Sequence, residues 1–244
     1  MLHKTNGIVL RSIKYGDTSL VSTIFTELYG LQTYMVQGVR SSKMAKNRAG
    51  SFQPAVLLEL VVYKQPNKNM QRIREFQAAY IYNSLQQDVI KNSIALFSVE
   101  ILLRLLPEEA PMPALFDFAF DYFTRLDKTP LSGVANFPLY FIVQCNRIFG
   151  FDLKGNYSAE TPHLDLSEGG FSEHSPTAPP YTSDEDATAL DHLLQANGYD
   201  ALDVIPMNGA MRLRLIDWYI TFMQRHTQHM GSIKSLSVIR AILH

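Results

Sequence analysis

The chain has 244 residues with 22 basic and 23 acidic side chains, so its net charge of −1 excludes no class of partner. Its single cysteine, Cys145, excludes an internal disulfide and a metal site made of cysteines alone. Charged residues interrupt the apolar runs within about ten positions, and the first residues lack the apolar segment of a signal peptide. We therefore expect a cytoplasmic protein that makes no contact with a membrane.

The charges are divided unevenly along the sequence. Residues 1–78 contain eleven Lys and Arg against four Asp and Glu, a net charge of +7, whereas residues 79–244 have a net charge of −8. Between Glu27 and Glu59 there is no carboxylate, yet four basic residues lie within nine positions. A basic segment without acidic partners suits a polyanion. The residues that we predict to touch DNA phosphates there are Arg40, Lys43, Lys46 and Arg48.

The first 78 residues show the two-residue period of β-strands. Apolar and β-branched side chains alternate in residues 20–26, 31–39, 52–63 and 70–76, with turn residues such as Gly16 and Asp17 between segments. Together with the residues before the turn at Gly16, these segments predict five strands, without a helix long enough for a crossover between parallel strands. A small closed barrel removes the exposed edges of such a sheet. A five-stranded oligonucleotide/oligosaccharide-binding (OB) barrel fits the size, and an SH3-like barrel is the alternative.

After Phe76 the apolar residues recur every three or four positions, which predicts helices. The expected helices cover residues 79–89, 93–106, 114–126, 134–149, 183–195, 207–225 and 232–243. The fifth of them begins with a capping box at Ser183 and Asp186. Residues 150–182 are rich in glycine and proline and predict an irregular excursion or a short hairpin. We therefore expect an α+β protein with two domains, an OB-fold over residues 1–78 and an all-α domain over residues 79–244.

The sequence contains no constellation of residues that predicts an enzyme. It has neither of the common glycine-rich patterns that bind phosphates. The carboxylate pair Glu108 and Glu109 lies beside prolines at a helix end, where solvated charge is the usual role. His226 and His229 lie at the end of a predicted helix, where contact with the helix dipole explains them better than a metal does. We predict a non-enzymatic protein without a cofactor or a bound metal.

Aromatic residues are interleaved with the cations of the basic segment. A protein that binds a single strand of nucleic acid needs aromatic rings on which bases stack and cations that reach the phosphates. We expect Phe25 and Phe52 to fill the barrel core instead. Besides the four residues of the basic loop, the predicted DNA contacts are Arg11, Lys14, Tyr34 and Lys64.

Four short motifs in the N-terminal part support this interpretation. They are GIVL at residues 7–10, YGD at 15–17, TELYG at 26–30 and GVR at 38–40. Together with the closing stretch HMGSIKSLSVIRAIL, they resemble the RecO family of recombination mediators. The resemblance implies an OB-fold and a helical domain that bind single- and double-stranded DNA and anneal strands at the nucleoid of the bacterial cytosol. It also implies cooperation with RecR and with the single-stranded-DNA-binding protein in loading a recombinase.

The sequence departs from the family in one respect. Many relatives carry a four-cysteine zinc module in the region of residues 150–180, and this chain has no cysteine there. His163 and His174 cannot replace four thiolates. We therefore predict that the excursion holds no structural zinc.

The resemblance also implies a site for a second protein on the helical domain. In the family, this domain is expected to bind the acidic, phenylalanine-ended C-terminal tail of the single-stranded-DNA-binding protein. Such a tail needs an apolar pocket with a cation beside it, near phenylalanines such as Phe116, Phe120, Phe123, Phe137 and Phe141. The candidate cations are Arg104, Arg125, Lys128 and Arg147. An alternative function is that of an adaptor whose barrel binds a partner protein rather than DNA.

Overall fold

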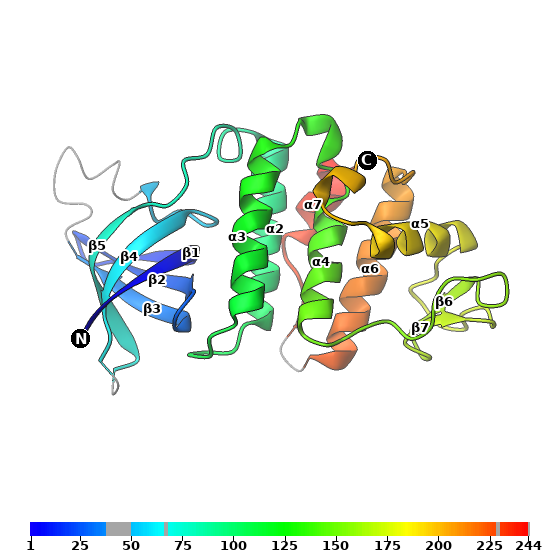
Figure 1. Cartoon of the computed structure of the whole chain (residues 1–244), viewed down its shortest axis with the longest axis horizontal. Coiled ribbons are helices and arrows are strands. Elements are labelled where there is room, and N and C mark those ends of the chain that lie inside the picture. The colour runs from blue at the N-terminus through cyan, green and yellow to red at the C-terminus, as the bar shows by residue number, and fades with distance from the viewer. Residues whose placement is uncertain (38–49, 66–67, 228–229, 244) are drawn as a thin grey trace. The chain divides into compact units, whose positions relative to one another are not determined.

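The computed structural model describes residues 1–37, 50–65, 68–227 and 230–243 (Figure 1). The chain forms two compact units. The first consists of Met1–Gln87 and Leu102–Asp127, and the second consists of Asp88–Ile101 and Lys128–His244. Helix α2 (Val89–Leu105) therefore contributes residues to both units.

A closed five-stranded barrel forms most of the first unit. Its strands are β1 (Leu2–Tyr15), β2 (Ser19–Thr26), β3 (Gly30–Val36), β4 (Leu57–Tyr63) and β5 (Met70–Ala78). They are hydrogen-bonded in the order β1-β2-β3-β5-β4, with β3 and β5 parallel and the other pairs antiparallel. This five-stranded barrel, closed between β4 and β1, confirms the predicted OB-fold.

Strand β1 bends because it belongs to two parts of the barrel wall. Its first half pairs with β4, and the half that begins at Gly7 pairs with β2. The register shifts between Val9 and Arg11, and such a bulge lets a strand turn and twist more strongly. A Cβ atom on Gly7 would lie 2.8 Å from side-chain carbons of Ile24 and Leu60, so glycine permits the close packing at this bend. The two halves of β1 consequently present their outward side chains to different surroundings.

The turn between β2 and β3 is fixed by one threonine and one glycine. The Thr26 hydroxyl donates to the Gly30 carbonyl oxygen at 2.9 Å and accepts a hydrogen bond from the Tyr29 N–H at 3.2 Å. Gly30 has a φ of 63°, a conformation that glycine adopts without strain. These bonds explain why a Thr-x-x-x-Gly motif suits the turn.

The prediction of a strand over residues 52–63 is wrong for its first part, because β4 begins only at Leu57. Ala55 has a φ of 67°, and its N–H donates to the Val9 carbonyl oxygen at 2.8 Å. Phe52 is buried and packs edge-on against Phe76, with ring centroids 4.8 Å apart. The apolar run thus reflects a buried turn. Phe25 is buried as well, as expected.

The helix predicted over residues 79–89 is also wrong. Residues 79–88 form bends and turns, and α2 begins at Val89. The buried carboxylate of Asp127 accepts hydrogen bonds from the backbone N–H groups of Asn83, Ser84 and Leu85 at 2.8–3.1 Å. The hydroxyl of Tyr80 donates to the same carboxylate at 3.1 Å. Asp127 therefore holds this segment in a compact, non-helical conformation.

Helix α3 (Pro113–Lys128) supports the barrel within the first unit. It begins at a proline, which lacks an N–H at a position where the first turn of a helix needs none. The ring of Phe116 packs edge-on against Phe25 of β2, with centroids 5.4 Å apart. Burial of these two rings closes the barrel on its α3 side.

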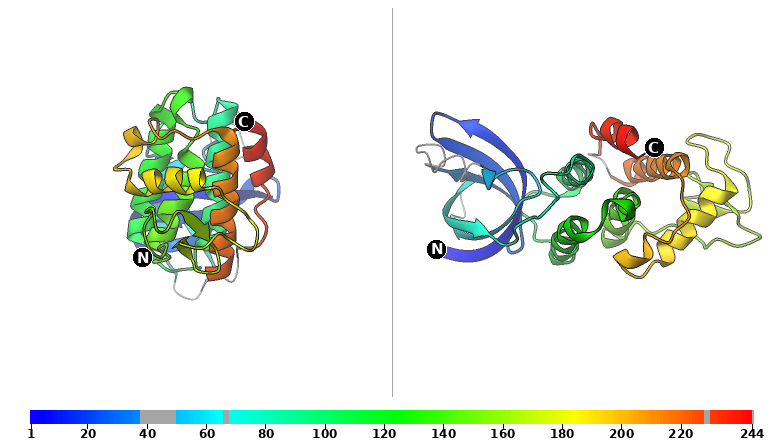
Figure 2. Two further views of the ribbon diagram at one scale, coloured as in Figure 1. Left: turned by 90° about the vertical axis from the view of Figure 1, so that its right-hand side faces the viewer. Right: turned by 90° about the horizontal axis from the view of Figure 1, so that it is seen from above.

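The second unit contains most of the predicted helices. They are α4 (Phe137–Ile148), α5 (Asp184–Gln195), α6 (Gly209–His226) and α7 (Leu236–Ile242). Helix α6 packs against α4 and α5 (Figure 2), and α5 begins with the predicted capping box of Ser183 and Asp186. The excursion contains a hairpin of β6 (His163–Asp165) and β7 (Gly170–Ser172), which confirms the short hairpin.

Candidate nucleic-acid interface

The outward side of strands β1, β2 and β3 forms a surface of two cations and a strip of apolar side chains. Residues directly opposite one another on neighbouring strands share one side of the sheet. Ser22 and Tyr34 are such a pair, and both are buried on the core side. The residues on either side of this pair along each strand therefore point outward, away from the core. We call this surface the cationic face; its rows are Arg11–Thr23–Thr33, Ile13–Val21–Met35–Arg72 and Tyr15–Ser19.

The cationic face has the chemistry that single-stranded nucleic acid requires. Arg11 and Arg72 are exposed, and neither forms an ion pair with another residue that the structure describes. Ile13 is 49% exposed and Tyr15 is 54% exposed, so an aliphatic side chain and an aromatic ring are available for contact with bases. The rows contain no carboxylate, so nothing in the face opposes a phosphate.

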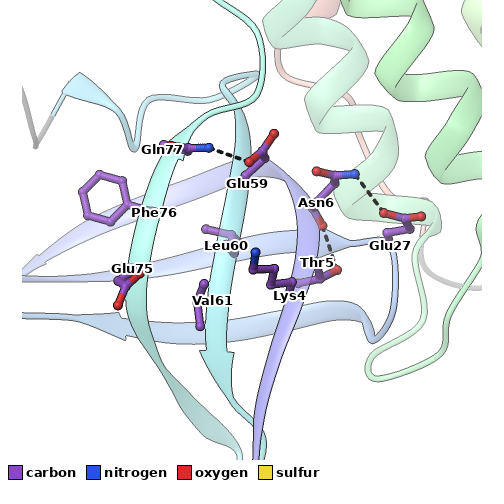
Figure 3. A pocket seen from close by; sticks show the side chains of 10 residues that line it. All are labelled: Lys4, Thr5, Asn6, Glu27, Glu59, Leu60, Val61, Glu75, Phe76 and Gln77. Carbon is purple, nitrogen blue, oxygen red and sulfur yellow. Dashed lines mark hydrogen bonds between the residues drawn. The ribbon is translucent and has the colours of Figure 1, made fainter.

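The outward side of β1, β4 and β5 has the opposite charge. A hollow of about 620 Å³ lies there, and its lining includes Glu27, Glu59 and Glu75 but only one cation, Lys4 (Figure 3). Asn6 donates to Glu27 at 3.0 Å, and Gln77 donates to Glu59 at 2.6 Å. We call this region the acidic hollow. Three carboxylates repel phosphates, so a polyanion should avoid this part of the barrel.

Of the predicted DNA contacts that the structure describes, some lie on the barrel surface and one lies in the barrel core. Arg11 lies on the cationic face, whereas Lys14 is exposed opposite the core residue Leu20 and therefore lies outside the rows. The prediction for Tyr34 is wrong, because its ring is 1% exposed within the barrel core and burial raises the pKa of its hydroxyl. The four cations of the predicted basic loop lie outside the described residues: Arg40, Lys43, Lys46 and Arg48.

Lys64 is held by partners inside the first unit. Its ammonium group donates to the Gln32 side-chain oxygen at 3.1 Å and lies 5.3 Å from the centre of the Tyr29 ring. The carboxylate of Glu109 lies 3.9 Å away. The structure thus gives Lys64 a role in joining the strands to the segment before α3, and a phosphate would have to compete with these contacts.

Arg72 and Ile13 are among the residues of the cationic face that the sequence reasoning missed. Arg72 reaches the face because β3 and β5 pair in parallel, with Met35 opposite Arg72. Ile13 points outward because of the bulge in β1. Neither a parallel pairing between distant strands nor a bulge leaves a clear mark in the sequence.

The four cations predicted for the partner tail lie in different environments. Arg104 is half-buried in α2, and Lys128 is exposed at the end of α3. Arg125 lies 3.5 Å from Asp121, and Arg147 donates to the carbonyl oxygen of Leu194 at 2.7 Å. Of the phenylalanines named with them, those buried are Phe116, Phe123, Phe137 and Phe141.

Phe120 is the partly exposed member of that group. It lines a hollow of about 300 Å³ together with Phe116 and the carboxylates of Glu27, Asp117 and Asp121. The ring offers an apolar contact, but the surrounding carboxylates oppose an acidic peptide. The candidate cation Arg125 lies 3.5 Å from Asp121, one of these carboxylates.

A serine, a histidine and an aspartate are aligned in the second unit. Ser175 Oγ lies 3.3 Å from His163 Nε2, and His163 Nδ1 lies 2.6 Å from Asp184 Oδ1. The order resembles a catalytic triad, but the carboxylate of a triad is buried, whereas the Asp184 side chain is 61% exposed. We interpret these bonds as a link between the β6–β7 hairpin and the first turn of α5.

The described part of the chain was searched for two further features, a metal-binding cluster and a membrane-spanning helix. No three His, Cys, Asp or Glu side chains are grouped there in a way that could hold a metal ion. No described helix is both long enough and apolar enough to cross a membrane.

Comparison with known proteins finds one family over most of the sequence. The model of the family described as "Recombination protein O N terminal" matches residues 1–82, and that of "Recombination protein O C terminal" matches residues 86–237. The chain is 32% identical over 244 residues to the DNA repair protein RecO of Bacteroides fragilis, covering 99% of each chain. It is 29% identical over 242 residues to RecO of Christiangramia forsetii, covering 99% of each. RecO of Flavobacterium psychrophilum is 29% identical over 241 residues, covering 98% of each.

Proposed function

Because the chain belongs to the RecO family, we propose that it binds DNA in recombinational repair through the cationic face of its barrel. The observation that carries this proposal is the register that places Arg11 and Arg72 on one outward surface with Ile13, Tyr15 and Met35. Cations beside apolar side chains suit a strand whose phosphates and bases are contacted together. The acidic hollow repels phosphates from the β4 side of the barrel, and this repulsion favours binding of the DNA strand on the cationic face.

The sequence between β3 and β4 contains four further cations. We propose that its Arg and Lys side chains contact phosphates and that Lys14 does so from the end of β1. Each neutralised phosphate releases counterions, so the affinity falls steeply with salt and depends little on base sequence. The four residues of the segment are Arg40, Lys43, Lys46 and Arg48.

Binding alone accounts for the proposed activity, without bond chemistry, a cofactor or a metal. A protein that neutralises phosphates reduces the repulsion between complementary strands and so promotes their annealing. We propose that the chain acts in this way on single- and double-stranded DNA in the bacterial cytosol, together with RecR. It would help to load a recombinase on DNA covered by the single-stranded-DNA-binding protein.

The acidic tail of the single-stranded-DNA-binding protein would dock on the helical part of the chain. Phe120 supplies a partly exposed ring on α3, and Arg125 and Lys128 follow it on the same helix. We propose that one of these two cations pairs with the terminal carboxylate of the tail. The other two candidates are less suited, because Arg104 is half-buried and Arg147 donates to Leu194.

The test is a titration of labelled oligonucleotides followed by fluorescence anisotropy at two salt concentrations. Single strands should bind with a steep salt dependence, and complementary strands should anneal faster in the presence of the protein. Binding that is weak at low salt, or independent of salt, would overturn the proposal.

A second candidate function is supported by the acidic hollow. A basic or polar segment of another protein could bind among its carboxylates, and the barrel would then act as an adaptor. The same titration separates the two functions, because an adaptor would show little affinity for DNA at either salt concentration.

A further inference from the structure

The second unit contains a cavity of about 310 Å³ that the proposed function does not use. It is bounded by the last turns of α4 and α5, by Tyr219 of α6 and by residues 151–157 of the excursion. Its size is at the lower end of the range of pockets that hold small ligands or single side chains. Its lining combines polar side chains of three helices with aromatic rings of the excursion.

Asn146 of α4 is the most informative residue of the lining. It is 2% exposed, and its side-chain amide donates to the Ile142 carbonyl oxygen at 3.1 Å. Its Oδ1 atom has no hydrogen-bond partner among the residues that the structure describes. A buried acceptor without a partner destabilises the folded protein, so such an atom favours a ligand that donates a hydrogen bond.

The charged groups of the cavity point to the same kind of ligand. Asp152 forms no ion pair with another described residue, and Asp191 accepts a hydrogen bond from Gln195 at 2.7 Å. The one cation of the lining, Arg147, donates to the Leu194 carbonyl oxygen. Helices α4 and α5 both end at the cavity, and helix C-termini carry partial negative charge. The lining therefore combines two carboxylates and two helix C-termini with one cation, so its net potential is negative.

Aromatic rings complete the lining. Tyr157 and Phe171 lie edge to face with centroids 6.3 Å apart, and Phe151 lines the cavity beside them. Aromatic faces attract cations and stack well on the planar guanidinium group, which also donates hydrogen bonds in its plane. A compact ammonium group would use the charge but not the planar stacking.

We propose that this cavity binds a guanidinium group, supplied by an arginine side chain of a partner protein. The guanidinium would donate to Asn146 Oδ1 and to the carboxylate of Asp152 and would lie against the rings of the excursion. This site is independent of DNA binding by the barrel, so each proposal can fail without the other.

The test uses N-acetyl-arginine methylamide as the probe and the full chain labelled with ¹⁵N. Saturable shifts of the Asn146 side-chain amide and of the indole of Trp218, the neighbour of Tyr219 in α6, are expected. The uncharged citrulline analogue should bind at least about tenfold more weakly, because it lacks the charge-assisted hydrogen bonds. The lysine analogue and putrescine should also bind more weakly than the arginine probe.

Variants separate a specific site from general attraction. Asp152→Asn removes the charge of an exposed side chain and should weaken the arginine probe about tenfold, whereas Asp200→Asn, exposed and outside the cavity, should have no effect. Asn146→Leu should also weaken the probe. Equal binding of the arginine and citrulline probes, equal effects of the two aspartate variants, or the absence of a saturable shift would overturn the proposal. Putrescine binding as tightly as the arginine probe would show a small-cation site and would also overturn it.

Discussion

Replacement of Asp127 by asparagine should loosen the segment that joins the barrel to α2. Its carboxylate accepts hydrogen bonds from three backbone N–H groups, those of Asn83, Ser84 and Leu85. All three donate to Oδ1, so an amide whose oxygen takes this position keeps the bonds but removes the charge of their acceptor. A hydrogen bond to a charged group is stronger than one to a neutral group by about 1 kcal/mol, so the free energy of unfolding should fall by about 3 kcal/mol. That is a large share of the roughly 5–15 kcal/mol that stabilises a typical protein.

The assay is urea unfolding followed by circular dichroism, with amide hydrogen exchange measured at residues 83–85. Asp127→Asn should unfold at lower urea and exchange faster at these amides. The matched control is Asp121→Asn on the same helix, where an exposed carboxylate lies 3.5 Å from Arg125 and the expected loss is below about 1 kcal/mol. If the two variants were equally stable and exchange at residues 83–85 were unchanged, the reasoning would be refuted.

The same carboxylate predicts a dependence on pH. Burial alone would raise the pKa of Asp127, but the hydrogen bonds from Ser84, Asn83 and Leu85 outweigh it and lower the pKa below its ordinary value. A lowered pKa in the folded state means that the stabilisation is present above the unfolded pKa of about 4 and is lost as the pH falls further. Wild type should therefore lose more stability than Asp127→Asn below about pH 4.

Three other predictions concern separate parts of the chain. Tyr15→Ala should weaken single-strand binding by about 1–3 kcal/mol in an anisotropy titration, because an exposed ring is lost, whereas Tyr34→Phe should leave the affinity unchanged; equal effects would contradict the assigned faces. Asp186→Ala should lower the free energy of unfolding by about 2 kcal/mol, because the capping box and two bonds of 2.8 Å to Arg214 are lost; unchanged urea unfolding would contradict this. Elemental analysis should find no stoichiometric zinc, because the excursion has no cysteine, and one tightly bound zinc per chain would contradict this.

The barrel could be predicted from the sequence because strand alternation is a local signal. Residues 20–26 and 70–76 alternate clearly, and β2 and β5 occupy these positions. The parallel pairing of β3 with β5 could not be predicted, because it joins strands that are distant in the sequence. Arg72 was therefore missed even though its strand was correctly expected.

The faces of the strands were harder to predict than the strands themselves. A shift of one residue moves a side chain from the core to the surface. Tyr34 was predicted to contact DNA and Tyr15 was not, yet Tyr34 is buried opposite Ser22 and Tyr15 is exposed beyond the bulge of β1. Composition alone could not distinguish the two rings.

The segment after β5 shows how tertiary contacts override local periodicity. Residues 79–89 have helical spacing, but Asp127, more than forty positions away, binds the backbone N–H groups that a helix would use. A buried turn around Ala55 likewise replaced part of a predicted strand. In both cases the deciding partner is distant in the sequence.

The central claim is that the cationic face binds DNA, and the salt dependence of the Arg11→Ala/Arg72→Ala variant tests it most directly. The matched control is Lys4→Ala/Arg74→Ala, which removes the same charge from the acidic hollow and from the ion pair of Arg74 with Glu75. For a single strand, loss of two phosphate contacts should reduce the slope of log K against log salt by about 1.4 and weaken binding, while the control keeps the wild-type slope. Equal slopes in the two double variants would contradict the account.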